Sequence, residues 1–138
     1  MAIAHPIAEW LTEVDDIALS ATVAPAEAQD RYVRAMVMLL QFCPDALGEC
    51  AMCRARQAEV MHNVRIGAFE TAALRLLPAD ACLMTSTPGA GHFLASVRLA
   101  GQRRESTSSG KTFALAVVSA LALSLVDHFH EMAGGQPL

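Results

Sequence analysis

The chain has 138 residues, a length typical of one domain. Hydrophobic residues make up 54% of it and charged residues 17%, which excludes intrinsic disorder and predicts a full hydrophobic core. The formal net charge of −4 gives no overall attraction to nucleic acid or to anionic lipid. We therefore expect a single domain over residues 1–138, with a helical part over about 1–78 and a sheet with a final helix over about 79–138.

The N-terminal sequence lacks the basic start of a secretory signal, because Met1–Glu9 reaches an acidic residue before any long apolar run. The most apolar stretch, Phe113–Val126, is shorter than the roughly 20 residues that cross a bilayer. We therefore expect no membrane span, a cytoplasmic location and four reduced cysteines. Lys111 is the only lysine beside many arginines, a habit that we associate with a GC-rich bacterial genome.

The first half of the chain has helical periodicity. One amphipathic helix begins near Pro6, and a second opens at Pro25 and ends before Pro44. A third pattern starts after Gly48 and continues to Pro78, and the sequence leaves open whether it breaks at Gly67. Apolar residues recur at three- and four-residue spacing in the first two helices: Ile7, Trp10, Leu11, Val14, Ile17 and Ala18, then Val33, Met36, Val37 and Leu40.

The pattern changes after Pro78 to short segments typical of strands. We predict a strand over 81–86, a turn over 88–91 and an alternating strand over 92–99. A polar edge strand is predicted over 103–107, followed by Ser108 or Ser109 as the N-cap of a helix that runs to about Met132. The predicted fold class is α+β: N-terminal helices, then a small three-stranded antiparallel sheet packed against a long apolar C-terminal helix.

The last helix is apolar on nearly all sides, which predicts burial on nearly all sides. A small sheet covers only one side, so the other needs the N-terminal helices or a second copy of the chain. The sequence does not decide between these, and we favour a second copy. We therefore expect a homodimer whose interface residues are Leu115, Val118, Ala122 and Leu125.

The helix end Ala72-Ala-Leu-Arg-Leu-Leu-Pro78, three short strands and the Ala- and Leu-rich helix after Gly110 follow one another over residues 69–132. This order resembles the small α-β-β-β-α domains of phages and prophages known as ABA-sandwich domains, a resemblance that implies no catalytic residues. It is also similar in topology to a double-stranded-RNA-binding domain. The Lys-rich cluster which that family places at the start of the last helix is reduced here to Lys111.

Three cysteines and a histidine are the best candidates for a metal site. Cys43, Cys50 and Cys53 have the spacing C-x6-C-x2-C, and His62 would be a fourth ligand of the kind that zinc prefers. Strong zinc signatures have two close cysteine pairs, and Cys50 and Cys53 are expected on one helical face among apolar residues. We interpret the cysteines as core thiols and expect no cofactor.

Two further motifs have simple structural explanations. Ser106–Thr112 ends like a nucleotide-binding loop, but Glu105 stands where that pattern requires glycine. Asp127, His130 and Glu131 share one side of the last helix and would suit a metal, although the helix dipole alone favours histidine there. No nucleophile–base set or carboxylate pair is recognisable, so we do not expect an enzyme.

Four basic residues gather around the predicted hairpin, where they would contact phosphate or nucleic acid, or simply protect a sheet edge: Arg98, Arg103, Arg104 and Lys111. The sequence does not determine the function. Our hypothesis is a non-enzymatic interaction or structural module that self-associates or binds a protein partner. The alternatives are a weak nucleic-acid-binding module using these residues, and a small zinc or thiol protein.

Overall fold

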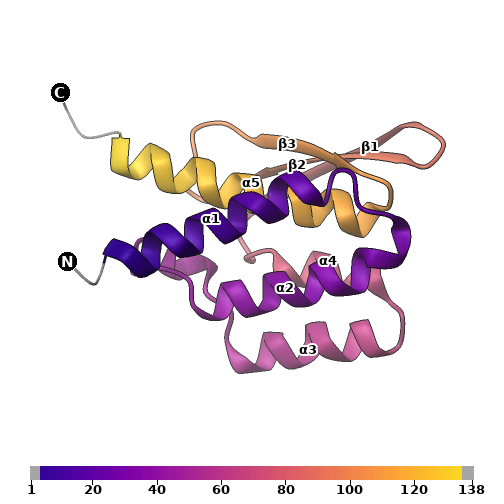
Figure 1. Ribbon diagram of the computed structural model, residues 1–138, viewed down its shortest axis with the longest axis horizontal. Coiled ribbons are helices and arrows are strands. Elements are labelled where there is room, and N and C mark those ends of the chain that lie inside the picture. Colours follow the sequence, from indigo (N-terminus) through magenta and orange to yellow (C-terminus); the bar gives the residue numbers. More distant parts are fainter. Residues whose placement is uncertain (1–3, 135–138) are drawn as a thin grey trace.

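The computed structural model describes residues 4–134 and confirms the α+β class (Figure 1). Helices come first, a three-stranded antiparallel sheet follows with the order β1-β2-β3, and one long helix ends the chain. The elements are α1 (Ala4–Ser20), α2 (Gln29–Gln41), α3 (Arg54–Arg65), α4 (Phe69–Leu76), β1 (Cys82–Gly89), β2 (His92–Arg98), β3 (Ser106–Gly110) and α5 (Phe113–Gly134), with 3-10 turns at Ala26–Ala28 and Asp45–Cys50.

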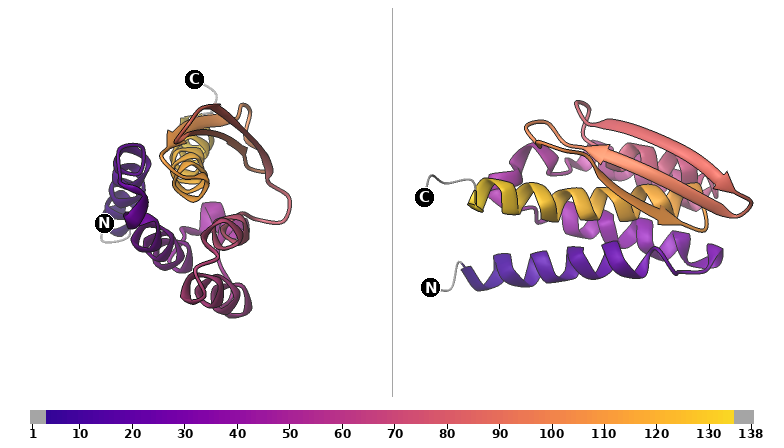
Figure 2. Two further views of the ribbon diagram at one scale, coloured as in Figure 1. Left: turned by 90° about the vertical axis from the view of Figure 1, so that its right-hand side faces the viewer. Right: turned by 90° about the horizontal axis from the view of Figure 1, so that it is seen from above.

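Helix α5 lies between two layers (Figure 2). The sheet packs on one side of it through β2 and β3, and α1, α2 and α4 pack on the other. Helix α3 is outermost, against α4 and α2. The apolar stripes predicted for α1 and α2 face this core: Trp10, Val14 and Ala18 are buried, as are all four α2 residues of the stripe.

The N-terminal helices bury the side of α5 that the sheet leaves uncovered. Leu115, Val118, Ala122 and Leu125 are each 0% exposed within one chain. Their assignment to a homodimer interface is therefore wrong, because α1, α2 and α4 already occupy the space that a second copy would fill. Self-association stays a prediction, and it would need another surface.

The open question at Gly67 is answered by a helix break. Gly67 has φ of 77°, a left-handed conformation that glycine adopts without steric cost. The Ala68 N–H donates to the Asn63 carbonyl (2.8 Å) and the Gly67 N–H to the Val64 carbonyl (3.1 Å), the paired bonds of a Schellman motif. Helix α3 ends there and α4 begins a new direction.

The helix expected to start after Gly48 begins only at Arg54. Cys50 ends a 3-10 turn, and Cys53 has extended backbone as the residue before α3. The expectation that both cysteines lie on one helical face is therefore wrong. The reason is a tertiary bond: the Met52 N–H donates to the Leu40 carbonyl (3.1 Å), which fixes an extended segment and buries Met52.

The third strand lies three residues later than predicted, over Ser106–Gly110. The segment before it is a loop that turns at Gly101 (φ 86°) and directs Gln102 into the interior. Ser108 and Ser109 are consequently strand residues and do not cap α5. The cap is Thr112, whose Oγ1 accepts a hydrogen bond from the Leu115 N–H (3.1 Å).

By length and composition alone, α5 is a candidate membrane span, since the helix continues to Gly134 and not only to Val126. Of its most apolar window, 61% is buried inside the fold, as a core helix would be. One such helix is weak evidence for a membrane span, because core helices of soluble proteins have the same length and apolar composition.

Gly110 ends β3 directly against the first turn of α5. A Cβ at this position would lie 2.5 Å from the Ala116 nitrogen and 2.8 Å from the Leu115 carbonyl carbon, so backbone would have to move. We expect Gly110→Ala to lower the free energy of unfolding by about 3 kcal/mol, measured by urea denaturation. Gly89→Ala is the control, since a Cβ there meets nothing within 4 Å. An equal effect of both substitutions would contradict this role of Gly110.

Candidate functional site

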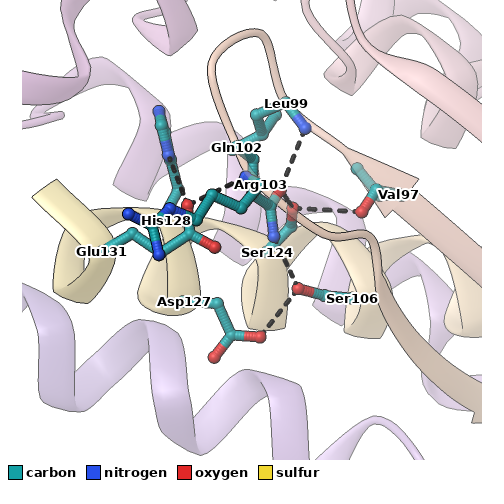
Figure 3. A network of polar contacts seen from close by, with 9 residues as sticks. All are labelled: Val97, Leu99, Gln102, Arg103, Ser106, Ser124, Asp127, His128 and Glu131. Carbon is teal, nitrogen blue, oxygen red and sulfur yellow. Dashed lines mark hydrogen bonds and ion pairs between the residues drawn. The ribbon is translucent and has the colours of Figure 1, made fainter. Parts of the chain in front are cut away.

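A buried polar network joins the β2–β3 loop to α5 (Figure 3). Gln102, only 3% exposed, is its centre. The Gln102 Oε1 accepts hydrogen bonds from the Leu99 N–H (2.9 Å) and from the Ser124 hydroxyl, and its Nε2 donates to the Ser106 Oγ (2.9 Å). The Ser106 hydroxyl in turn donates to the Asp127 carboxylate (2.7 Å).

Within this network both polar atoms of the Gln102 amide form hydrogen bonds, and only one Nε2 proton is left unused. Polar groups in an apolar interior need such partners. The sequence analysis missed it because Gln102 falls between the predicted strands 92–99 and 103–107, where no periodicity indicates burial. The available signal was a polar residue between Gly101 and the strand, with Ser106 four residues later.

The second carboxylate of α5 holds the same loop. The Glu131 Oε1 accepts the Arg103 N–H (3.0 Å) and lies 3.8 Å from the His128 Nδ1, a distance too long for a hydrogen bond. The His128 Nδ1 is buried and has no hydrogen-bond partner among the described residues. Asp127 and Glu131 thus both position the loop. Among residues 4–134, they and His130 are not grouped so that they could hold a metal ion.

His128 also lines a cavity of about 320 Å³. The 3-10 turn contributes Asp45 and Cys50 to its wall, and the α4–β1 connection contributes Asp80. Among residues 4–134, no three His, Cys, Asp or Glu side chains are grouped so that they could hold a metal ion. The cavity therefore gathers ligand-type residues without arranging them as a metal centre.

The proposed zinc ligands are distributed over different environments. Cys43 and Cys50 are close enough to interact, whereas Cys53 and His62 are exposed on or before α3. Burial, with a smaller contribution from the neighbouring Cys50, raises the pKa of the Cys43 thiol to about 12. The Cys43 Sγ donates to the Leu47 carbonyl (3.2 Å) and acts as a buried thiol at neutral pH.

The four basic residues do not form one patch. Arg98, Arg103 and Arg104 are at the loop end of the hairpin, near the point where Val97 pairs with Ser106. Lys111 follows Gly110, which pairs with Phe93 at the opposite end of the sheet. Four residues of strand separate the two ends, roughly 13 Å. A single phosphate contact shared by all four is therefore excluded by the strand geometry.

A surface that the sequence analysis did not identify lies between α1 and α2. It is an apolar groove of about 510 Å³, here called the α1–α2 groove, lined by Glu13, Asp16, Ile17, Ala35, Met38, Leu39 and Phe42. Phe42 is 69% exposed and Met38 is 54% exposed. Both residues lie outside the buried α2 stripe. Apolar residues at such positions are the sequence feature from which this surface could have been predicted.

A buried side chain connects the two helices that form the α1–α2 groove. Trp10 of α1 donates its Nε1 proton to the carbonyl of Leu39 (2.8 Å), an α2 residue that lines the groove.

Comparison of the chain with known protein families, curated proteins and solved structures found no match. A function for this chain therefore has to be inferred from its own geometry.

Exposure separates the four thiols into two classes. Cys53 and Cys82 are exposed, Cys50 is buried, and Cys43 is half-buried with a raised pKa. We expect dithiobis(nitrobenzoate) at neutral pH to modify the exposed Cys53 and Cys82 thiols rapidly. The other two thiols should react only after the protein unfolds. Mass spectrometry of digested protein identifies the modified residues. Rapid modification of Cys43 in folded protein would contradict this assignment.

Removing the Gln102 amide leaves the Leu99 N–H without its acceptor and the Ser106 Oγ without the donor Nε2, whereas the Ser124 hydroxyl keeps the Val97 carbonyl at 3.3 Å. We expect Gln102→Leu to lower the free energy of unfolding by about 2–4 kcal/mol, since each buried unpaired group costs about 1–3 kcal/mol. Arg104→Leu, at an exposed position of the same loop, should change it by less than about 0.5 kcal/mol. Chemical denaturation of both variants makes the comparison, and equal stabilities would refute the role of the network.

Proposed function

We propose that the chain is a non-enzymatic interaction module that binds an amphipathic helix of a partner protein in the α1–α2 groove. The observation that carries this proposal is the exposure of Phe42 and Met38, which line the groove together with the apolar residues Ile17, Ala35 and Leu39. Exposed apolar side chains that gather in a groove are typical of protein-binding surfaces. Helices bind such grooves through apolar residues spaced three and four positions apart.

The charge of the groove favours a basic partner. Glu13 and Asp16 line its α1 edge, and Asp15 is exposed on the same helix. No Lys or Arg lines the groove. A partner helix with Lys or Arg beside its apolar face would place those residues against the α1 carboxylates, which increases the association rate and selects the orientation.

Helical 18-residue peptides test the proposal by fluorescence anisotropy. The first has Leu at helical spacing and Lys elsewhere, and we expect it to bind better than the same pattern with Glu. Phe42→Ser should weaken binding by about tenfold, the effect of truncating an interface anchor. Met84→Ser is the matched control, because Met84 is an exposed apolar residue of β1 outside the groove.

Three outcomes would contradict this function. Equal binding of the Lys and Glu peptides, or equal losses in Phe42→Ser and Met84→Ser, would show that the groove does not select a basic helix. Light scattering could also show that the wild-type protein is a dimer and that the Phe42→Ser variant is a monomer. In that case the groove binds a second copy of the chain. That result would restore the predicted homodimer with a new interface.

A further inference from the structure

A second cavity, of about 500 Å³, is lined by residues from the starts of α2, α4 and α5. The three helices begin at the same end of the molecule (Figure 1). We call it the Phe cavity, because Phe69, Phe93 and Phe113 line it. The chain has five Phe residues, so more than half of them line this one cavity. All three are only partly buried, and they pack against the core while lining the cavity.

Three elements far apart in the sequence bring these rings together. Phe69 is the first residue of α4, and Phe113 is the first residue of α5. Phe93 pairs with Gly110 across the β2–β3 ladder, which places it beside the segment that leads into α5. The polar side chains of Gln29, Thr71 and Thr112 also line the cavity. Aromatic rings and polar groups that line one cavity are typical of sites that bind small molecules with both an apolar and a polar part.

The same cavity carries one positive and one negative side chain. Lys111, the only lysine of the chain, lines it from the β3–α5 connection, and Glu70 lines it from the first turn of α4. Both are exposed, and neither forms an ion pair with another of the described residues. The cavity thus offers a cation and a carboxylate, each free to bind a ligand charge.

This combination selects among ligand classes. A nucleotide or another polyanion would be attracted by Lys111 and repelled by Glu70, and a simple cation would meet the reverse. A zwitterion with an apolar side chain satisfies both charges and the three rings. A peptide end carries only one of the two charges, so a free amino acid fits better than a peptide.

We infer that the Phe cavity binds a free α-amino acid with an aromatic or large apolar side chain. The ligand carboxylate pairs with Lys111, its ammonium pairs with Glu70, and its side chain packs among Phe69, Phe93 and Phe113. The positive end of the α5 dipole, which begins two residues after Lys111, adds to the attraction for the carboxylate. This site is independent of the α1–α2 groove.

Titration calorimetry with L-phenylalanine as the probe tests the inference on the full chain. We expect saturable one-to-one binding. Phenylpropanoate, which lacks the ammonium, and phenethylamine, which lacks the carboxylate, should each bind at least about tenfold more weakly, because each loses a charged hydrogen bond. L-alanine should also bind more weakly, because it leaves the three rings without a partner.

Two charge-removing variants assign the contacts. Lys111→Met should weaken L-phenylalanine binding at least about tenfold but should not weaken phenethylamine binding, because this cation loses only the repulsion from Lys111. Glu70→Gln should weaken L-phenylalanine binding similarly but should not weaken phenylpropanoate binding, because this anion loses only the repulsion from Glu70. Arg104→Gln and Glu59→Gln are the matched controls at exposed positions that do not line the cavity. Circular dichroism melts verify that all four variants fold.

The inference is overturned if folded wild-type protein shows no saturable L-phenylalanine binding at millimolar concentration. It is also overturned if phenylpropanoate or phenethylamine binds as well as L-phenylalanine, or if Lys111→Met and Glu70→Gln behave as their controls do. Phe42→Ser should retain L-phenylalanine binding, so failure of the groove proposal and failure of this one are separate results.

Discussion

The fold depends on the burial of α5 from two opposite sides. Twelve of its residues between Ala114 and Val126 are buried. Leaving a Val or Leu of this helix in water would cost about 1.5–3 kcal/mol each, so neither covering layer is dispensable. The dependence is mutual, because three short strands gain stability only by packing on an apolar partner. Sheet, α5 and N-terminal helices should therefore unfold together.

Two serines within this apolar helix connect the layers. The Ser119 hydroxyl donates to the Ala18 carbonyl (2.6 Å) at the end of α1 and lies 2.6 Å from the Ser108 hydroxyl of β3. The Ser124 hydroxyl lies 3.3 Å from the Val97 carbonyl of β2 and also bonds Gln102. A buried hydroxyl without such a partner would destabilise the fold, so these contacts fix how α1 and the sheet are placed along α5.

How far the sequence predicted the fold depends on how local each determinant is. The α1 and α2 stripes and the alternation of β2 are periodic within one element, so they were predicted correctly. The segment near Cys53 depends on the bond from the Met52 N–H to the Leu40 carbonyl, and the loop at Gln102 depends on the bond from the Ser124 hydroxyl to the Gln102 amide oxygen. No periodicity encodes either bond. The candidate sites could not be predicted from the sequence for the same reason. The α1–α2 groove and the Phe cavity exist only where separate elements meet.

The last helix, apolar on nearly all sides, led to the prediction of a homodimer, and the structure gives its apolar character a different explanation. A helix that is covered on both sides needs apolar residues on both faces, whereas a helix covered on one side needs them on one face only. All four of the expected interface residues of α5 are buried in the core of a single chain. Total hydrophobicity therefore does not locate an interface. An interface is indicated where exposed apolar side chains lie outside the buried stripe of their own helix. Met38 of α2 and Phe42, the residue that follows this helix, are such side chains, and they lie one turn apart. Because core packing does not explain these two residues, the α1–α2 groove is a better candidate for binding a partner than any face of α5.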